Sequence, residues 1–357
     1  MLMAIIAIIL TLLLVVGIHE GGHALVARYF QVKIKKISIG FGKPLLRWQT
    51  EKGCEWVWAM WPLGGYVQLE NSRISPIDPS EYSSCFDKKP TWQRILILLA
   101  GALANVVTAW IALILIYTVG LSYKMPQVGT IQPNSIAAEA KIKPGDQFIA
   151  IGGHKTTSWN DVGMQLVIFW GKKEVPVTLI EGSGKAQKNV VLNLSNVSLY
   201  SEKSTLLTQL GITPNLFATH GKIQFTSIVE AIHQTNQTIV DMLYFFLVIF
   251  KQLFSGVISF SMLFGPLSVF AASVASLTQG VVVFMFFIAT LSLAVALINL
   301  FPIPGLDGGS IAYAVIEKIR GKSVSVAMEL LLHRLVFIVL CVVLVHLLMN
   351  DLQRIIG

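Results

Sequence analysis

The sequence predicts a multi-span α-helical membrane protein with four transmembrane helices, an inserted α+β domain and a membrane-associated β-hairpin. Three observations predict this class. The 357-residue chain is 54% hydrophobic and only 13% charged, whereas a soluble domain typically has about 25% charged residues. Four apolar runs approach the roughly 20 residues that cross a bilayer core. A more polar stretch between the second and third runs alternates short β-like segments with glycine-rich turns.

The four predicted transmembrane segments are residues 1–27, 95–121, 281–307 and 330–357, the last with a short tail. The first apolar run lacks a basic start and is longer than the apolar core of a typical signal peptide. We therefore expect this run to stay in the protein as a membrane span.

Basic residues predict the orientation of these spans. Lys and Arg gather in residues 28–94, between the first two spans, and again in residues 308–329, after the third. Because short cytosolic loops are enriched in Lys and Arg, both segments are expected in the cytosol. Residues 122–280 and both termini would then lie outside. This topology accounts for the net charge of +8, so we expect no nucleic-acid partner.

The first span ends in His19-Glu20-Gly21-Gly22-His23. Residues i and i+4 share one face of a helix, so His19 and His23 can bind one metal ion while Glu20 reaches a water molecule on that ion. A chance match is the alternative. Ionisable residues within a span are costly and usually functional, however, so we predict a metal site at the cytosolic end of the first span.

Residues 122–215 form the predicted soluble domain on the outer side of the membrane. About 90 residues suit one compact domain, and no second copy of the pattern is evident in the sequence. Strands are expected at residues 128–131, 148–151, 175–180 and 189–194, and a helix is expected at 160–169.

The cytosolic segment 28–94 is predicted to contain a β-hairpin. Its expected strands are residues 55–60 and 66–70, with Pro62-Leu63-Gly64-Gly65 between them. Tryptophan favours the membrane interface, and we expect the hairpin to dip into the cytosolic leaflet beside the metal site. A surface loop with buried tryptophans is the alternative. The tryptophans concerned are Trp48, Trp56, Trp58 and Trp61.

Four motifs resemble, in the same order, those of the site-2 protease family of intramembrane zinc metalloproteases. The resemblance covers nearly the whole chain and is closest to the bacterial sigma-E-regulating branch with one PDZ domain. In one departure, the stretch from Gly101 to Asn105 has alanine where the family commonly has proline. The four motifs are His19 to His23, Gly64-Gly65-Tyr66-Val67, the PDZ-like stretch Gln132 to Asp161, and Asn299 to Gly309 with its Leu306-Asp307-Gly308 triplet.

The resemblance implies a zinc metalloendopeptidase whose Zn²⁺ is held by His19, His23 and Asp307, with Glu20 as the catalytic base. It also implies that Asn105 is catalytic, holding the substrate backbone or the developing oxyanion. A plain hydrogen bond between helices is the alternative for Asn105. Asn299 is expected to be structural, and His333 is the substitute considered for the third ligand.

A fifth apolar stretch, residues 238–254, is the ambiguous part of the predicted topology because it contains Asp241 and Lys251. If Asp307 meets the histidine pair, the span before it must end in the cytosol. One additional crossing would prevent this. We therefore expect residues 226–256, within an outer helical region of 216–280, to lie on the membrane surface or against the soluble domain.

The resemblance places the protein in the bacterial inner membrane and implies substrates that are single-span membrane proteins. Anti-sigma factors already trimmed outside the membrane are one such class, and remnant signal peptides are another. The PDZ-like domain could bind peptide C-termini or exclude bulky substrate ectodomains, and the sequence does not choose between these roles. A metal transporter and a membrane-anchored scaffold without protease activity are the competing functions, although neither needs Glu20 as a base.

Overall fold

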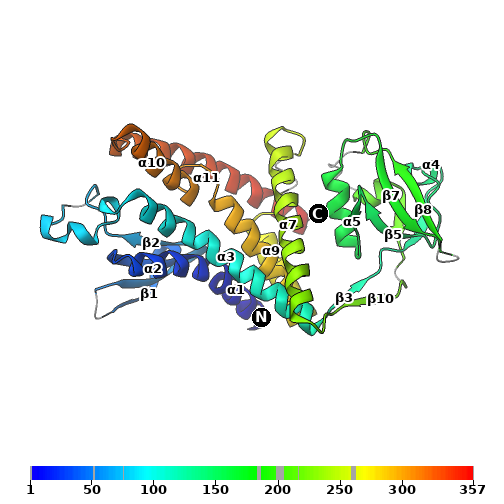
Figure 1. The fold of residues 1–357 in the computed structure, drawn as a ribbon, viewed down its shortest axis with the longest axis horizontal. Helices are drawn as coiled ribbons and strands as arrows, with labels where there is room; N and C mark the ends of the chain where they lie inside the picture. The colour runs from blue at the N-terminus through cyan, green and yellow to red at the C-terminus, as the bar shows by residue number, and fades with distance from the viewer. Residues whose placement is uncertain are drawn as a thin grey trace. The chain divides into compact units, whose positions relative to one another are not determined.

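The chain forms two compact units (Figure 1). The helical unit comprises residues 1–116, 235–243 and 263–357, and the β-rich unit comprises residues 117–234 and 244–262. The computed structural model describes residues 2–50, 53–74, 76–182, 186–197, 205–215, 217–258 and 263–356.

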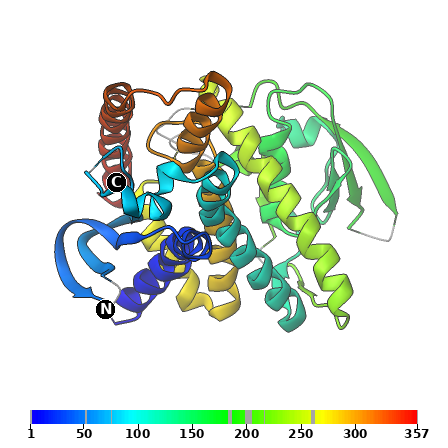
Figure 2. The same ribbon diagram turned by 60° about the vertical axis from the view of Figure 1, so that its left-hand side comes forward.

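Long helices make up most of the helical unit. The first span is one continuous helix that changes its winding: α1 (Leu2–Thr11) passes into a π-helical segment (Leu12–Gly17) and then into α2 (Ile18–Tyr29). Figure 2 shows this blue helix beside the cyan start of α3. The remaining helices are α3 (Thr91–Val119), which continues into the β-rich unit, α8 (Pro266–Gln279), α9 (Val281–Asn299), α10 (Asp307–Arg320) and α11 (Val326–Ile356).

Several of the described helices are long and apolar enough to cross a membrane. Four of them overlap the four predicted spans, and the prediction of a multi-span helical membrane protein is confirmed. The predicted end of the third span at residue 307 is wrong: α9 ends at Asn299, and Asp307 instead starts α10, which occupies most of the loop predicted at 308–329. The fifth, α7 (Ile228–Phe254), contains the ambiguous stretch 238–254. All five qualify by length and composition. The five are Leu2–Tyr29, Thr91–Val119, Ile228–Phe254, Val281–Asn299 and Val326–Arg354.

Two long strands, β1 (Ile34–Gln49) and β2 (Glu55–Leu69), form an antiparallel sheet. Near the turn, residues 46–49 of β1 oppose 55–58 of β2. Farther along, residues 37–39 of β1 have partners both in 56–58 and in 65–67 of β2. Gly40 and Gly64 lie within the strands at φ angles of +90° and +113°, which glycine adopts without steric cost.

The predicted strands 55–60 and 66–70 are present, but the predicted pairing of one with the other is wrong. Both belong to the single strand β2, and the register pairs each of them with β1. Gly64 bends β2 without ending it, so Pro62 to Gly65 lie within the strand. The lysines at the start of β1 obscure its alternation of polarity, which is why the sequence did not reveal this longer partner.

The β-rich unit contains a four-stranded antiparallel sheet in the order β6-β5-β7-β8. Two smaller pairs, β4 with β9 and β3 with β10, accompany it. Its elements are β3 (Leu121–Lys124), β4 (Val128–Ile131), α4 (Ile136–Glu139), β5 (Gln147–Ile151), β6 (His154–Lys155), α5 (Trp159–Ile168), β7 (Val175–Ile180), β8 (Gln187–Leu192), α6 (Leu206–Gln209), β9 (Ile212–Pro214) and β10 (His220–Ile223).

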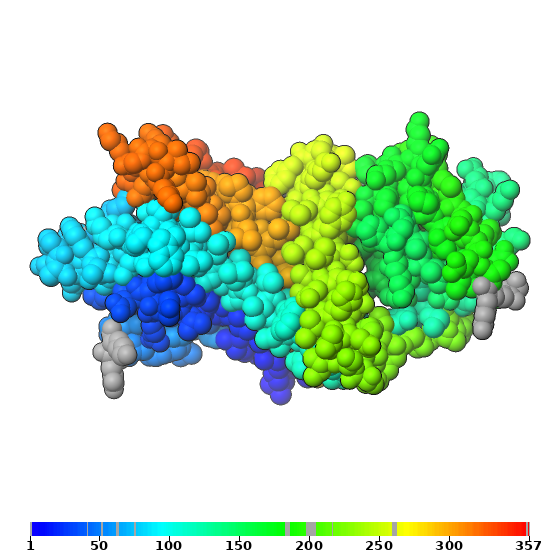
Figure 3. All heavy atoms as spheres, viewed as in Figure 1, coloured from blue at the N-terminus to red at the C-terminus, as the bar shows by residue number. Residues whose placement is uncertain are grey.

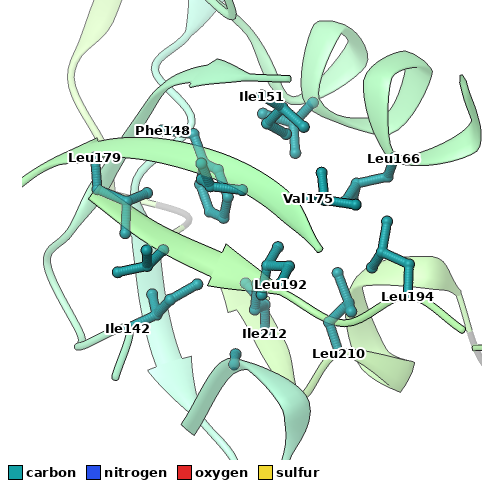
Figure 4. Close-up of a cluster of buried hydrophobic side chains, with 14 of the residues drawn as sticks. Ile142, Phe148, Ile151, Leu166, Val175, Leu179, Leu192, Leu194, Leu210 and Ile212 are labelled. Carbon is teal, nitrogen blue, oxygen red and sulfur yellow. The ribbon is translucent and has the colours of Figure 1, made fainter. Parts of the chain in front are cut away.

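The strands and the helix expected in residues 122–215 coincide with β4, β5, β7, β8 and α5 to within about two residues, the usual uncertainty of element ends. Alternation explains β7, whose buried residues Val175, Val177 and Leu179 take every second position. These side chains join Phe148 and Ile151 in one buried apolar cluster (Figure 4). The apolar pattern of the strands thus provides the core of this unit.

Candidate active site

The histidine pair lies on α2, where its spacing of four residues puts both rings on one face. His19, Glu20 and His23 are each no more than 7% exposed. The Nδ1 atom of His23 is 2.8 Å from the carbonyl oxygen of Ile97 on α3. A carbonyl only accepts a hydrogen bond, so Nδ1 of His23 carries the proton and its Nε2 has a free lone pair.

Two glycines allow α2 and α3 to approach closely. A Cβ on Gly22 would lie 2.4 Å from the carbonyl oxygen of Ala100, and a Cβ on Gly101 would lie 2.3 Å from His23 Nε2. Small residues at such contacts let membrane helices pack backbone against backbone. Gly22 therefore sets the separation of the helices, and Gly101 leaves space for the imidazole rings.

Asp307 is brought to this pair from the other end of the sequence, as the first residue of α10. Its Oδ2 atom is 3.2 Å from His19 Nε2 and 3.3 Å from His23 Nε2. Gly308 and Gly309 permit the sharp entry into α10, because a Cβ on either would lie 2.3 Å from a carbonyl oxygen of the preceding loop. The Leu-Asp-Gly-Gly turn is thus tightly packed.

The three predicted metal ligands form a site that suits a zinc ion. Their ligand atoms all lie within 4.8 Å of one another, and the two Nε2 atoms are 3.3 Å apart. Three electron-rich atoms converging at this separation repel one another unless a cation or a proton lies between them. Two imidazoles and one carboxylate are a donor set that zinc uses in catalytic sites, where a fourth position stays open.

Glu20 lies beside β2 as well as beside the histidines. A Cβ on Gly65 would be 3.1 Å from Glu20 Cγ and 2.7 Å from the carbonyl oxygen of Ser38. The backbone of Val67 is within hydrogen-bonding range of the Glu20 carboxylate. The motif glycine Gly65 therefore lets the strand pass directly against the glutamate.

Asn105 and Asn299 both contact His19. The amide Nδ2 of fully buried Asn105 is 3.3 Å from His19 Nδ1, and that of Asn299 is 3.5 Å from His19 Nε2. The structure thus brings the predicted residue Asn105 to the metal site. It also brings Asn299 there, which the sequence analysis assigned only a structural part and which no sequence signal placed beside His19.

His333, the substitute considered for the third ligand, is not in the described group of three metal-binding side chains. Its ring packs edge-on against Tyr313 of α10, with centroids 6.1 Å apart. The carboxylate of Asp307, not the ring of His333, lies beside the histidine pair.

Comparisons with known proteins agree with this geometry. Residues 7–344 match the family model described as "Peptidase family M50". The chain belongs to peptidase family M50, the site-2 protease family. It is therefore a site-2-type intramembrane zinc metalloprotease and an integral multi-pass membrane protein, and the zinc cofactor expected from the sequence is that of its family.

Its relatives extend over the full length of the chain. The regulator of sigma-E protease RseP of Escherichia coli (strain K12) is 28% identical over 445 aligned positions, covering 97% of each chain. The regulator of sigma E protease of Salmonella typhi is 27% identical over 447 positions, covering 98% of each. A relative from Rickettsia conorii is 30% identical over 359 positions, covering 99% of each. The alignments of 445 and 447 positions are much longer than the 357-residue chain, so those two relatives carry long additional segments, whereas the alignment of 359 positions is almost the length of the chain.

Proposed function

We propose that His19, His23 and Asp307 hold the catalytic zinc ion and that Glu20 is the general base of peptide-bond hydrolysis. The observation that carries this proposal is the convergence of three ligand atoms from α2 and α10 within 4.8 Å. Glu20 follows His19 on the same buried turn. The same residues at a surface loop would be solvated, whereas here each is withdrawn from solvent.

Zinc bound at these ligands would activate a water molecule and polarise the substrate carbonyl. Glu20 accepts the proton of the attacking water and can return it to the leaving nitrogen. Asn105 is the fourth proposed site residue. If His19 binds zinc through Nε2, its Nδ1 carries the proton, and we propose that the side-chain amide of Asn105 turns its otherwise unpartnered oxygen to accept from Nδ1 and so orients the ring. The alternative is that its amide stabilises the developing oxyanion.

The proposed substrates are single-span membrane proteins, including anti-sigma factors already trimmed outside the membrane. A helical substrate must unwind before its peptide bond can be attacked. Residues 65–69 of β2 have their ladder partners in residues 34–39, and the Val67 backbone reaches Glu20. We propose that the unwound segment pairs with this part of β2 by β-addition, which would present its carbonyl to Glu20. Deleting residues 64–68 should then abolish cleavage while zinc stays bound.

The membrane position of the sheet and the orientation of the spans are part of the same proposal. Leu46, Trp48 and Trp61 of the sheet are each at least half exposed, as expected of a hairpin seated in the cytosolic leaflet. Contact between Asp307 and His23 requires α9 and the first span to end on the same side. Because α3 returns the chain to the outer side, α7 then lies on the membrane or against the β-rich unit and does not cross.

The β-rich unit is proposed to be a PDZ-like domain on the periplasmic side of the bacterial inner membrane. There it would either bind new substrate C-termini or exclude bulky ectodomains. Both roles predict that its removal changes which substrates are cut. They differ in that only the first requires a peptide groove.

Purified protein and a labelled single-span substrate test the proposal directly. The wild type, Glu20→Gln and Asp307→Ala are compared for cleavage and for zinc content. We expect cleavage by the wild type, at least a roughly 100-fold loss in both variants, zinc retained in Glu20→Gln and zinc reduced in Asp307→Ala. Equal cleavage by all three would indicate a contaminating protease. Loss of activity with unchanged zinc in Asp307→Ala would direct attention to His333.

A further inference from the structure

Arg94 and Glu317 form a partly buried ion pair between α3 and α10. Arg94 Nη1 is 3.1 Å from Glu317 Oε2, and the two side chains are 8% and 30% exposed. The Arg94 guanidinium also lies over the Phe86 ring, 5.5 Å from its centroid. Figure 3 shows the cyan surface around the start of α3 beside the orange surface of α10.

Each of the two charges occupies the end of its helix that does not favour it. Arg94 is in the first turn of α3, where the helix dipole favours an anion, and Glu317 is in the last turn of α10, where it favours a cation. Arg94 also gives up most of its contact with water, and its Nε atom has no hydrogen-bond partner among the described residues. Neither charge stabilises its own helix. The pair therefore contributes through the contact that it makes between α3 and α10.

These helices carry the two halves of the candidate zinc site. Ile97 lies one turn after Arg94 on α3, and its carbonyl fixes the ring of His23. Gly101, one further turn along, leaves room for both imidazoles. The helix α10 begins at Asp307. The Arg94–Glu317 pair therefore joins the helix that orients His23 to the helix that supplies the carboxylate.

We propose that Arg94 and Glu317 are positioning residues that hold α10 against α3 and so keep Asp307 at the histidine pair. This proposal rests on the proposed zinc ligands. A carboxylate that is free to move away from the histidines lets the metal escape more often. Loss of the pair should therefore speed zinc release and lower kcat, while KM stays nearly unchanged because neither side chain touches the substrate.

Glu317→Gln is the principal variant, and Glu329→Gln is its matched control. Glu329 pairs with Arg73 at 3.0 Å and is 20% exposed, so it resembles Glu317 in geometry and burial but joins α11 to residue 73. Zinc release from the purified, full-length protein into excess chelator is followed together with the thermal midpoint. We expect release about 10-fold faster in Glu317→Gln, the usual size for a group supporting a metal ligand. Release from Glu329→Gln should remain within about twofold of the wild type.

A charge exchange provides the second measurement. Arg94→Glu alone should release zinc quickly, and the double variant Arg94→Glu/Glu317→Arg should recover near-wild-type retention, since both exchanged charges then suit their helix ends. Equal effects of Glu317→Gln and Glu329→Gln, or no effect of Glu317→Gln, would overturn the proposal. If the exchanged protein does not fold, the comparison of the two glutamine variants decides. If Asp307 is not a zinc ligand, the proposed zinc site is itself wrong, and Asp307→Ala then retains zinc like the wild type. That result distinguishes a wrong zinc site from a wrong role for Arg94 and Glu317.

Discussion

In the β-rich unit, apolar side chains from strands and helices share one buried cluster that includes Phe148, Leu179 and Ile212. In the helical unit the described buried clusters are small, such as the one formed by Val15, Phe284 and Ile288. Many of its large apolar residues instead face outward, and the most apolar stretch of α11 has no buried residues. Polar residues such as His19, Glu20 and Asn105 are buried beside these apolar ones.

The difference follows from the solvent of each unit. A domain in water gains stability by burying apolar surface. Helices in lipid gain nothing in this way, so they associate through close contacts of small residues and through polar groups. Gly22 and Gly101 provide such contacts, and the site residues are the polar groups. The proposed catalytic side chains are therefore part of the packing of the helical unit, whereas the β-rich unit packs without any of them.

The largest effect in this comparison should come from truncating a phenylalanine in each unit. Phe148→Ala empties a position with no exposure and should destabilise the β-rich unit by about 3–5 kcal/mol. Phe337→Ala on α11, 66% exposed, should change stability by less than about 1 kcal/mol, because its side chain faces lipid in either case. Amide hydrogen exchange of the full-length protein measures both. Similar effects would show that α11 has a buried partner in the membrane.

A second prediction concerns the adjacent glycines of the His-Glu-Gly-Gly-His motif. Gly22→Ala should reduce cleavage at least about 100-fold, because the new methyl group pushes α2 away from the backbone of α3 and shifts both ligands. Gly21→Ala is the matched control, since a Cβ there meets nothing within 4 Å. Cleavage of a labelled single-span substrate compares them. Equal losses would mean that backbone flexibility, and not helix spacing, is what the motif requires.

The sequence predicted the spans and most of the candidate site residues. It did not predict all of the contacts between residues that lie far apart in the chain. His19, Glu20 and His23 could be identified from local spacing alone, since four residues bring two side chains to one helix face. Asp307 lies far away in the sequence, and only the family resemblance connected it to the pair. Asn299 and the Arg94–Glu317 pair lacked any such signal, because their partners are set by tertiary packing.

The sequence did not predict α10 or β1, and in each case the residues of the element itself explain why. The helix α10 starts with Asp307-Gly308-Gly309, a sequence typical of a loop, and tertiary packing of the two glycines overrides that preference. The strand β1 carries lysines and glycines that hide its alternation. In the β-rich unit the alternation was clear, and the strands there were predicted nearly in register with the structure.

A third prediction separates the two roles proposed for Asn105. Asn105→Ala removes the amide that lies 3.3 Å from His19 Nδ1, and we expect about 10-fold weaker zinc retention because the ring loses its orientation. Chelator competition measures this effect beside kcat. If zinc retention is unchanged while kcat falls, the amide acts on the oxyanion instead.

The smallest effect should come from a charge cluster away from the metal site. Glu70, buried directly after β2, forms ion pairs with Lys33 and Lys35 at 3.2 and 3.1 Å. Burial alone would raise the pKa of Glu70, but the two lysines lower it below its ordinary value of 4.5. A lowered pKa in the folded state means that the contact stabilises the fold above about pH 4.5 and loses this effect as the pH falls through the folded value.

Glu70→Gln should therefore lower the thermal midpoint at pH 7 by an amount that corresponds to about 1 kcal/mol or less, because Lys33 is half exposed. The difference from the wild type should shrink as the pH is lowered below 4.5, where the wild-type carboxylate also becomes neutral. Glu81→Gln is the matched control: it removes the other carboxylate near Lys33, which is 53% exposed, and should change the midpoint less. A difference between Glu70→Gln and the wild type that persists undiminished at low pH would mean that Glu70 acts through its shape and not its charge. In that case this end of β2 would be packed by shape, in the same way as the core of the β-rich unit.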